Sequence, residues 1–92
     1  MREHRQFYIN GQWVDPVTPN DCHVIDPSTE EPCAVISLGA QADTDAAVAA
    51  AKAALPEWSE TPPAQRIALI EKMADIYERR IDEMAEVISM EM

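Results

Sequence analysis

The chain has 92 residues, enough for one small domain, and 47% of them are hydrophobic, so a folded rather than a disordered chain is expected. It carries 17 acidic and 7 basic side chains, a net charge of −10 spread along the chain, which disfavours nucleic acid and anionic membranes as partners. The first residues lack the apolar segment of a secretory signal and no apolar run is long enough to span a membrane, so we expect a cytoplasmic protein.

The first predicted element is a β-hairpin over residues 7–14, which follows an N-terminal tail of residues 1–6. Asn10 and Gly11 between two β-rich arms are typical of a type I′ turn, in which both central residues have positive φ. This two-residue turn predicts the cross-strand pairs Phe7 with Val14, Tyr8 with Trp13, and Ile9 with Gln12. Because two strands alone are marginally stable, the hairpin must pack on another element.

A second strand pair is expected over residues 22–26 and 33–38, and Gly39 ends the β part of the chain. A proline-flanked turn of polar residues joins the two strands. Pro32, at the start of the second strand, has no N–H to donate to a neighbouring strand, which favours an edge position.

Residues 40–92 are expected to be helical, in two or three helices. An alanine-rich helix is predicted over residues 43–55, because alanine favours helix and the acidic residues of its first turn suit the helix dipole. Pro56 is expected to end or kink this helix. The next helix is expected to begin with Thr61 as its N-cap and Pro62 at its first position.

The later helical region carries a continuous apolar stripe at steps of three and four residues. Its members are Ile67, Ile70, Ala74, Tyr77, Ile81, Met84 and Ile88. The stripe favours an intramolecular or subunit core over a coiled coil, and a one-residue interruption is expected between Arg79 and Asp82. The last helix reaches Met92 without a C-cap signal, which is typical of a truncated chain. Residues 7–39 and 40–92 are therefore expected to form one incomplete α+β domain.

The candidate catalytic and metal-binding side chains form no recognisable motif. Cys22 and His23 are adjacent, so a strand points them to opposite faces, and Cys33 and His4 complete no zinc-site spacing. Both cysteines are expected to be free thiols in a cytosolic chain. The chain has only two glycines and contains neither of the glycine-rich nucleotide-binding motifs. The residues alone therefore indicate no active site.

Four segments in a fixed order carry a resemblance to a known family. They are residues 7–14, 24–32, 42–58 and 61–75. Together they resemble the N-terminal portion of the NAD(P)-dependent aldehyde dehydrogenase superfamily. The resemblance implies that the chain is the start of the cofactor-binding domain of an α/β enzyme. It also implies that the partners of the chain are the remainder of the enzyme and, in the full-length form, a homo-oligomer.

The activity implied by the resemblance is oxidation of an aldehyde to a carboxylic acid, with a catalytic thiolate, NAD or NADP as hydride acceptor, and a glutamate that activates water. In the family these groups lie beyond the position of Met92, so no catalytic or cofactor-binding role passes to Cys22, Cys33 or any other residue here. We therefore expect the chain alone to bind neither NAD nor NADP and to be inert. The alternative is a non-enzymatic protein–protein interaction module that uses the Ile67–Ile88 stripe.

The resemblance carries two further expectations. In some family members, main-chain carbonyls just before an Asn/Asp-Pro step help to hold a monovalent cation, and the matching positions here are Val24 and Ile25. Their usual carboxylate partner would lie beyond Met92. The family commonly has glycine where this chain has Glu30, so Glu30 is expected either at positive φ under strain or in a reshaped turn.

Overall fold

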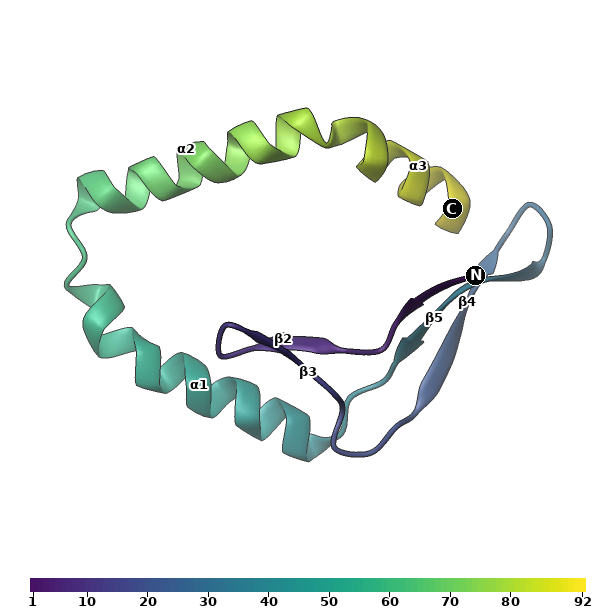
Figure 1. Ribbon diagram of the computed structural model, residues 1–92, viewed down its shortest axis with the longest axis horizontal. Coiled ribbons are helices and arrows are strands. Elements are labelled where there is room, and N and C mark those ends of the chain that lie inside the picture. The colour runs from purple at the N-terminus through teal and green to yellow at the C-terminus, as the bar shows by residue number, and fades with distance from the viewer.

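The computed structural model describes residues 1–92 as five strands followed by three helices (Figure 1). The strands are β1 (Arg2–His4), β2 (Phe7–Ile9), β3 (Gln12–Val14), β4 (Asp21–Asp26) and β5 (Glu31–Ser37). The helices are α1 (Gln41–Ser59), α2 (Pro63–Arg79) and α3 (Ile81–Glu91). The chain is thus the α+β segment that the sequence predicts. None of its helices combines the length and the apolar character needed to cross a membrane.

Strands β2 and β3 form a two-stranded antiparallel hairpin with the predicted register. Asn10 has a φ of 55° and Gly11 a φ of 75°, the positive values that a type I′ turn requires. Tyr8 and Trp13 are opposite each other, with ring centroids 5.2 Å apart and ring planes tilted by 58°. The predicted hairpin is therefore confirmed together with its cross-strand pairs.

The second sheet has three strands in the order β1-β5-β4, with β5 in the centre. Strands β4 and β5 are antiparallel, as their short connecting turn requires, and β1 pairs with β5 in parallel. β1 lies within residues 1–6, for which the sequence predicts only a tail. Its three side chains are all exposed and show no alternation, so the sequence pattern carries no strand signal. Arg5 follows it and donates to Asp21 Oδ1 from Nε at 2.9 Å, which ties this segment to the start of β4.

The expected edge position of Pro32 requires a correction, because β5 is the central strand of its sheet. β1 pairs only with residues Ala34–Ile36 of β5 and does not reach Pro32. At Pro32, β5 therefore has β4 as its single neighbouring strand. The missing Pro32 N–H thus removes no hydrogen bond to β1. The other expectation for this region is confirmed, since Glu30 has a φ of 61°.

Helix α1 is longer than predicted, because it continues through Pro56 to Ser59. Proline removes one main-chain hydrogen bond, and this single loss near the end of the helix does not stop it. The prediction of Thr61 as the next N-cap is wrong. Pro62 is the N-cap, with an extended ψ of 141°, and α2 begins at Pro63. A residue before proline is disfavoured in the α conformation, so the Pro62-Pro63 pair moves the helix start by one residue.

The interruption expected between Arg79 and Asp82 is confirmed at Arg80, which has a φ of −112° and separates α2 from α3. Asp82 lies in the first turn of α3 and does not cap it. The three helices therefore follow one another in an open arc around the strands, and α3 returns to contact β4 (Figure 1).

The buried part of the chain is small and lies where β5 meets the start of α1. Only Ala34, Val35, Ser37 and Asp43 are buried. The molecule extends over 49 × 34 × 16 Å, and its smallest dimension is little more than the roughly 10–12 Å diameter of one helix. A compact chain of this length would have a radius of gyration of about 12 Å, whereas the observed value is 17.0 Å. The chain forms essentially one layer and leaves its apolar faces uncovered.

Asp43 links the helical and strand parts of the chain. Its Oδ2 accepts the Ala40 N–H at 2.8 Å and its Oδ1 accepts the Val17 N–H at 2.9 Å. Ala40 lies just before α1, and Val17 lies in the connection between β3 and β4. These hydrogen bonds, from Ala40 first and then from Val17, lower the pKa of Asp43 from its ordinary value of 3.8.

Replacing Glu30 with glycine is expected to stabilise the chain. A residue with a Cβ pays about 1–2 kcal/mol in the left-handed region, and glycine loses somewhat more backbone entropy, so the net gain is about 1 kcal/mol. Urea unfolding followed by tryptophan fluorescence would measure it. Glu31→Gly is the matched control, because Glu31 lies in β5 at negative φ and should lose stability. A Glu30→Gly midpoint at or below that of the parent would contradict the strain at this turn.

Asp43→Asn is expected to lower the urea midpoint at neutral pH. Because the folded pKa of Asp43 is lowered, its stabilisation is present above the ordinary carboxyl pKa and is lost as the pH falls through the folded value. The difference between parent and variant should therefore shrink in acid. Asp45→Asn, which removes an exposed charge from the same helical turn, is the control. Equal effects of the two substitutions at every pH would rule out the linking role of Asp43.

Candidate functional site

The side chains that commonly carry chemistry are dispersed over the structure. No group of three or more His, Cys, Asp or Glu side chains lies close enough together to hold a metal ion. Cys22 and Cys33 are free and half-buried. The Cys22 thiol lies 3.9 Å from the main-chain oxygen of His23. This contact is with the main chain of His23 and does not involve its imidazole. The described side chains thus form no catalytic cluster.

The irregularity of the β4–β5 ladder lies at the positions of the two predicted carbonyl ligands. Val24 is opposite Ala34, but the next residue, Ile25, is opposite Pro32, so Cys33 is left without a cross-strand partner. The register shift between Val24 and Ile25 is a β-bulge, and bulges re-aim the main chain. The structure therefore places Val24 and Ile25 side by side at a local break in the sheet.

At the bulge, a proline and a cysteine of β5 lie next to these two carbonyls. Pro32, opposite Ile25, has no N–H to donate. The carbonyl of Val24 accepts a hydrogen bond from the Cys33 thiol at 3.4 Å, a weak donor. The sequence does not predict this thiol contact, although Pro32 indicates that the pairing of the strands changes here.

These two carbonyls fit part of the ligand set of a hard cation. Hard cations in proteins take oxygen ligands, and main-chain carbonyls are among them. Asp26, the nearest carboxylate in the chain, uses Oδ1 to accept the Ser28 N–H at 2.8 Å. Val24 and Ile25 would therefore supply two oxygen ligands, and the rest of a coordination shell would come from elsewhere.

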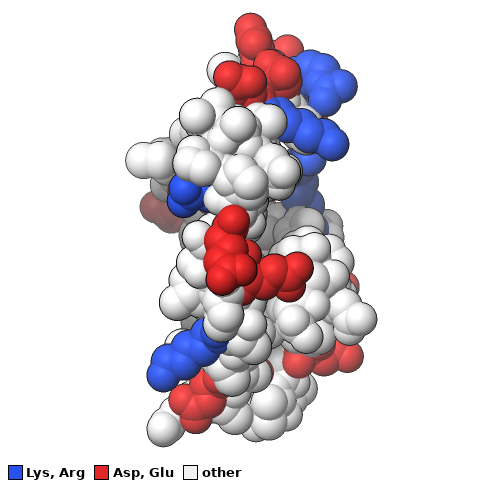
Figure 2. Space-filling model, turned by 90° about the vertical axis from the view of Figure 1, so that its left-hand side faces the viewer, with Lys and Arg blue, Asp and Glu red and all other residues white.

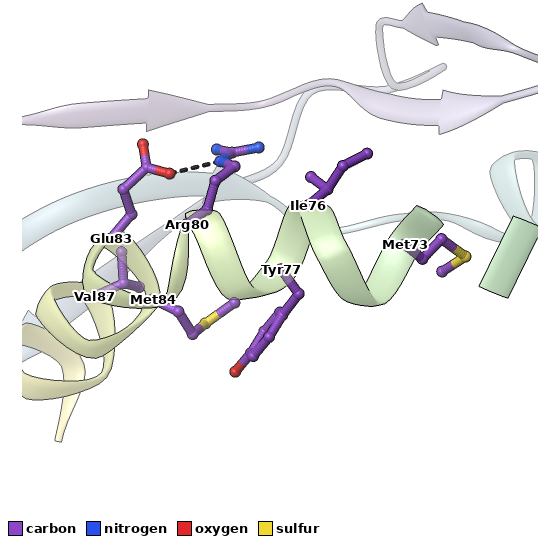
Figure 3. A pocket seen from close by; sticks show the side chains of 7 residues that line it. All are labelled: Met73, Ile76, Tyr77, Arg80, Glu83, Met84 and Val87. Carbon is purple, nitrogen blue, oxygen red and sulfur yellow. Dashed lines mark hydrogen bonds and ion pairs between the residues drawn. The ribbon is translucent and has the colours of Figure 1, made fainter. Parts of the chain in front are cut away.

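A second candidate surface is the apolar side of α2 and α3. It contains a groove of about 450 Å³. The groove is lined by Met73, Ile76, Tyr77, Arg80, Glu83, Met84 and Val87. Tyr77 and Met84 extend to the same side of the helices, and an Arg80–Glu83 ion pair lies where α2 meets α3 (Figure 3). The groove shares Tyr77 and Met84 with the stripe that the sequence predicts.

The Ile67–Ile88 stripe is left uncovered. Ile67 is 59% exposed, Ile70 62% and Ile81 50%. Such a contiguous apolar face on a folded chain marks a contact surface. On the face in Figure 2, charged side chains form small clusters separated by uncharged surface, acidic in the middle and of both signs at the top and the bottom. The stripe is thus a surface for apolar packing, which agrees with a core-facing helix.

Comparison with known proteins finds relatives of the chain in sequence and in backbone structure. The family model described as "Aldehyde dehydrogenase family" matches residues 13–92. A 3-succinoylsemialdehyde-pyridine dehydrogenase from Pseudomonas sp is 44% identical over 92 residues, which is 100% of this chain and 19% of that relative. The chain therefore spans about a fifth of the length of this relative.

Solved structures show the same backbone. An aldehyde dehydrogenase from Bartonella henselae is 56% identical with a TM-score of 0.98, over 100% of this chain and 19% of that chain. Aldehyde dehydrogenase C from Pseudomonas syringae, a C291A mutant in complex with NAD+ and octanal, is 42% identical with a TM-score of 0.94. That match covers 96% of this chain and 18% of the other. The open arc of strands and helices is thus also found within much longer proteins.

Proposed function

The chain belongs to the aldehyde dehydrogenase family, and we propose that it acts as the N-terminal segment of an enzyme that oxidises an aldehyde to a carboxylic acid with NAD or NADP. The observation that carries this proposal is the TM-score of 0.98 at 56% identity over the whole chain. NAD is the cofactor of one structural neighbour, in its complex with octanal. The family match favours this interpretation over the interaction module based on the Ile67–Ile88 stripe.

The proposed role of the chain is structural support for the rest of the enzyme. The one-layer shape and the exposed stripe support this, because apolar faces of this kind are stable when another layer covers them. We propose that the remainder of the enzyme covers them and that the full-length protein is a cytoplasmic homo-oligomer. The segment would then support the remainder of the cofactor-binding domain without touching the reacting atoms.

The chain alone is expected to show no turnover with NAD+, NADP+ and a panel of aldehydes. A nucleophilic cysteine needs a base or a cation to lower its pKa, and the Cys33 thiol instead donates to the carbonyl of Val24. Absorbance of the reduced cofactor would measure turnover, with the Bartonella henselae enzyme as the positive control. Cofactor reduction by the parent that disappears in a Cys22→Ser/Cys33→Ser variant would overturn the supporting role.

We further propose that the Val24 and Ile25 carbonyls help to hold a monovalent cation in the full-length enzyme. The bulge and Pro32 support this, because the regular pairing breaks between Val24 and Ile25 and Pro32 has no N–H to offer to the Ile25 carbonyl. A cation bound only by the folded state raises stability in proportion to its occupancy. The melting temperature should therefore be higher in potassium chloride than in choline chloride at the same ionic strength.

Pro32→Ala tests the cation proposal in the full-length enzyme. Alanine restores an N–H opposite Ile25, which can compete for the carbonyl, so the difference between the potassium and choline melting temperatures should shrink. Pro19→Ala is the matched control, because Pro19 is exposed and lies in the connection between β3 and β4, outside the β4–β5 ladder. Equal melting temperatures of the parent in the two salts, or the same salt dependence in parent and Pro32→Ala, would contradict the proposal.

A further inference from the structure

The tip of the β2–β3 hairpin combines two residues that react with each other in proteins. Asn10 and Gly11 are both exposed. The Asn10 side-chain amide and the Gly11 N–H take part in no hydrogen bond within the chain. Apart from Gly11 itself and its two chain neighbours, no residue has a heavy atom within 4 Å of the place where a Gly11 Cβ would stand. The Asn10 amide and the Gly11 nitrogen are therefore exposed to water and held by no hydrogen bond within the chain.

We propose that Asn10 is a site of spontaneous deamidation and isoaspartate formation. The Gly11 nitrogen loses its proton and attacks Cγ of Asn10, a new N–Cγ bond forms, and the Cγ–Nδ2 bond breaks to release ammonia. Water then opens the resulting five-membered succinimide at either carbonyl. Opening at the side-chain carbonyl gives aspartate, and opening at the main-chain carbonyl gives isoaspartate. The net change is one amide and one water converted to a carboxylate and an ammonium ion, without any oxidant.

The other asparagine of the chain has the opposite environment. The Asn20 N–H donates to Ser37 Oγ at 3.2 Å, and its carbonyl accepts the Leu38 N–H at 2.8 Å. The next residue is Asp21, which has a side chain and begins β4, whereas Gly11 has none and lies in a turn. The nitrogen that would attack the Asn20 amide therefore belongs to a residue that has a side chain and is paired with Ser37 in the β4–β5 ladder. We expect the reaction at Asn10 and its absence at Asn20 in the same sample.

Isoaspartate at the hairpin tip would change the register of the hairpin. The main chain of isoaspartate runs through Cβ and is one atom longer, while the type I′ turn allows just two residues between Ile9 and Gln12. The cross-strand pair of Tyr8 and Trp13 depends on that register. The tip also borders a hollow of about 340 Å³ on α1. The α1 residues that line the hollow are Ala47, Ala50, Ala51 and Ala54. A new carboxylate beside this apolar surface disfavours contact between the hairpin and α1.

The proposal is tested by incubating the intact protein in a mildly alkaline buffer and mapping its peptides by mass spectrometry over time. The expected result is loss of the Asn10 amide, two product peptides that correspond to aspartate and isoaspartate, and an intact Asn20. Conversion should slow in mildly acidic buffer, because the attacking nitrogen must lose its proton. Conversion of both asparagines at the same rate, or of neither, would overturn the proposal.

Two variants separate the new charge from the altered main chain. Asn10→Asp has the same charge as the products but a normal main chain, and aspartate suits a type I′ turn, so the NMR contact between Tyr8 and Trp13 should persist. The isoaspartate fraction of the aged parent should lose it. Asn10→Gln keeps an amide but cannot form the five-membered ring, so it should stay unmodified. A retained Tyr8–Trp13 contact in the isoaspartate fraction would refute the register change.

Discussion

The hydrogen bonds of the Asp43 carboxylate hold the two halves of the chain in one arrangement. One carboxylate oxygen accepts the Ala40 N–H at the start of α1, and the other accepts the Val17 N–H from the strand half. Asp43 is 7% exposed, so these bonds replace water around a charge that would otherwise be costly to bury. These two bonds orient the start of α1 relative to the strands, and the other helices of the arc follow from α1. Phe7 and Asp43 also lie close together around Gly39, at 3.7 Å and 3.9 Å from the place where a Cβ of this glycine would stand.

Beyond that junction, the shape of the chain comes from local bonding rather than from a shared core. Of the 57 backbone hydrogen bonds, 45 lie within helices and strands, while only four residues are buried. The Pro62-Pro63 pair sets the corner between α1 and α2, and Arg80 sets the one between α2 and α3. An apolar stripe can stay exposed in such a structure because each helix satisfies its own main chain. The same arrangement within aldehyde dehydrogenases about five times longer is consistent with a segment whose backbone is specified locally and whose faces are covered by other layers.

The parts of the fold that the sequence predicts correctly are those whose cause is local. Asn10 and Gly11 determine the hairpin register, and the replacement of glycine by Glu30 identifies a positive φ. The missed strand β1 depends on pairing with β5, which lies about thirty residues further along the chain, and its exposed residues carry no pattern. The prediction of Thr61 as an N-cap is wrong because Pro63 disfavours the helical conformation at Pro62, so the helix begins one residue later. Side-chain motifs could not reveal the Val24 and Ile25 oxygens, since any residue has a carbonyl, and only the resemblance pointed to them.

The bulge that arranges those carbonyls follows from the turn before it. The Asp26 carbonyl accepts the Glu30 N–H at 2.8 Å, and the Asp26 side chain accepts the Ser28 N–H. Both hydrogen bonds of this tight turn are therefore accepted by its first residue, Asp26. Closing it in this way requires the left-handed conformation at Glu30, and the next strand then starts with Pro32, which cannot bond to β4. The ladder resumes its regular register only at Ala34, and Cys33 is the residue left over. A strained turn and a proline thus shift the pairing by one residue, and that shift places Val24 and Ile25 on the two sides of a break in the ladder.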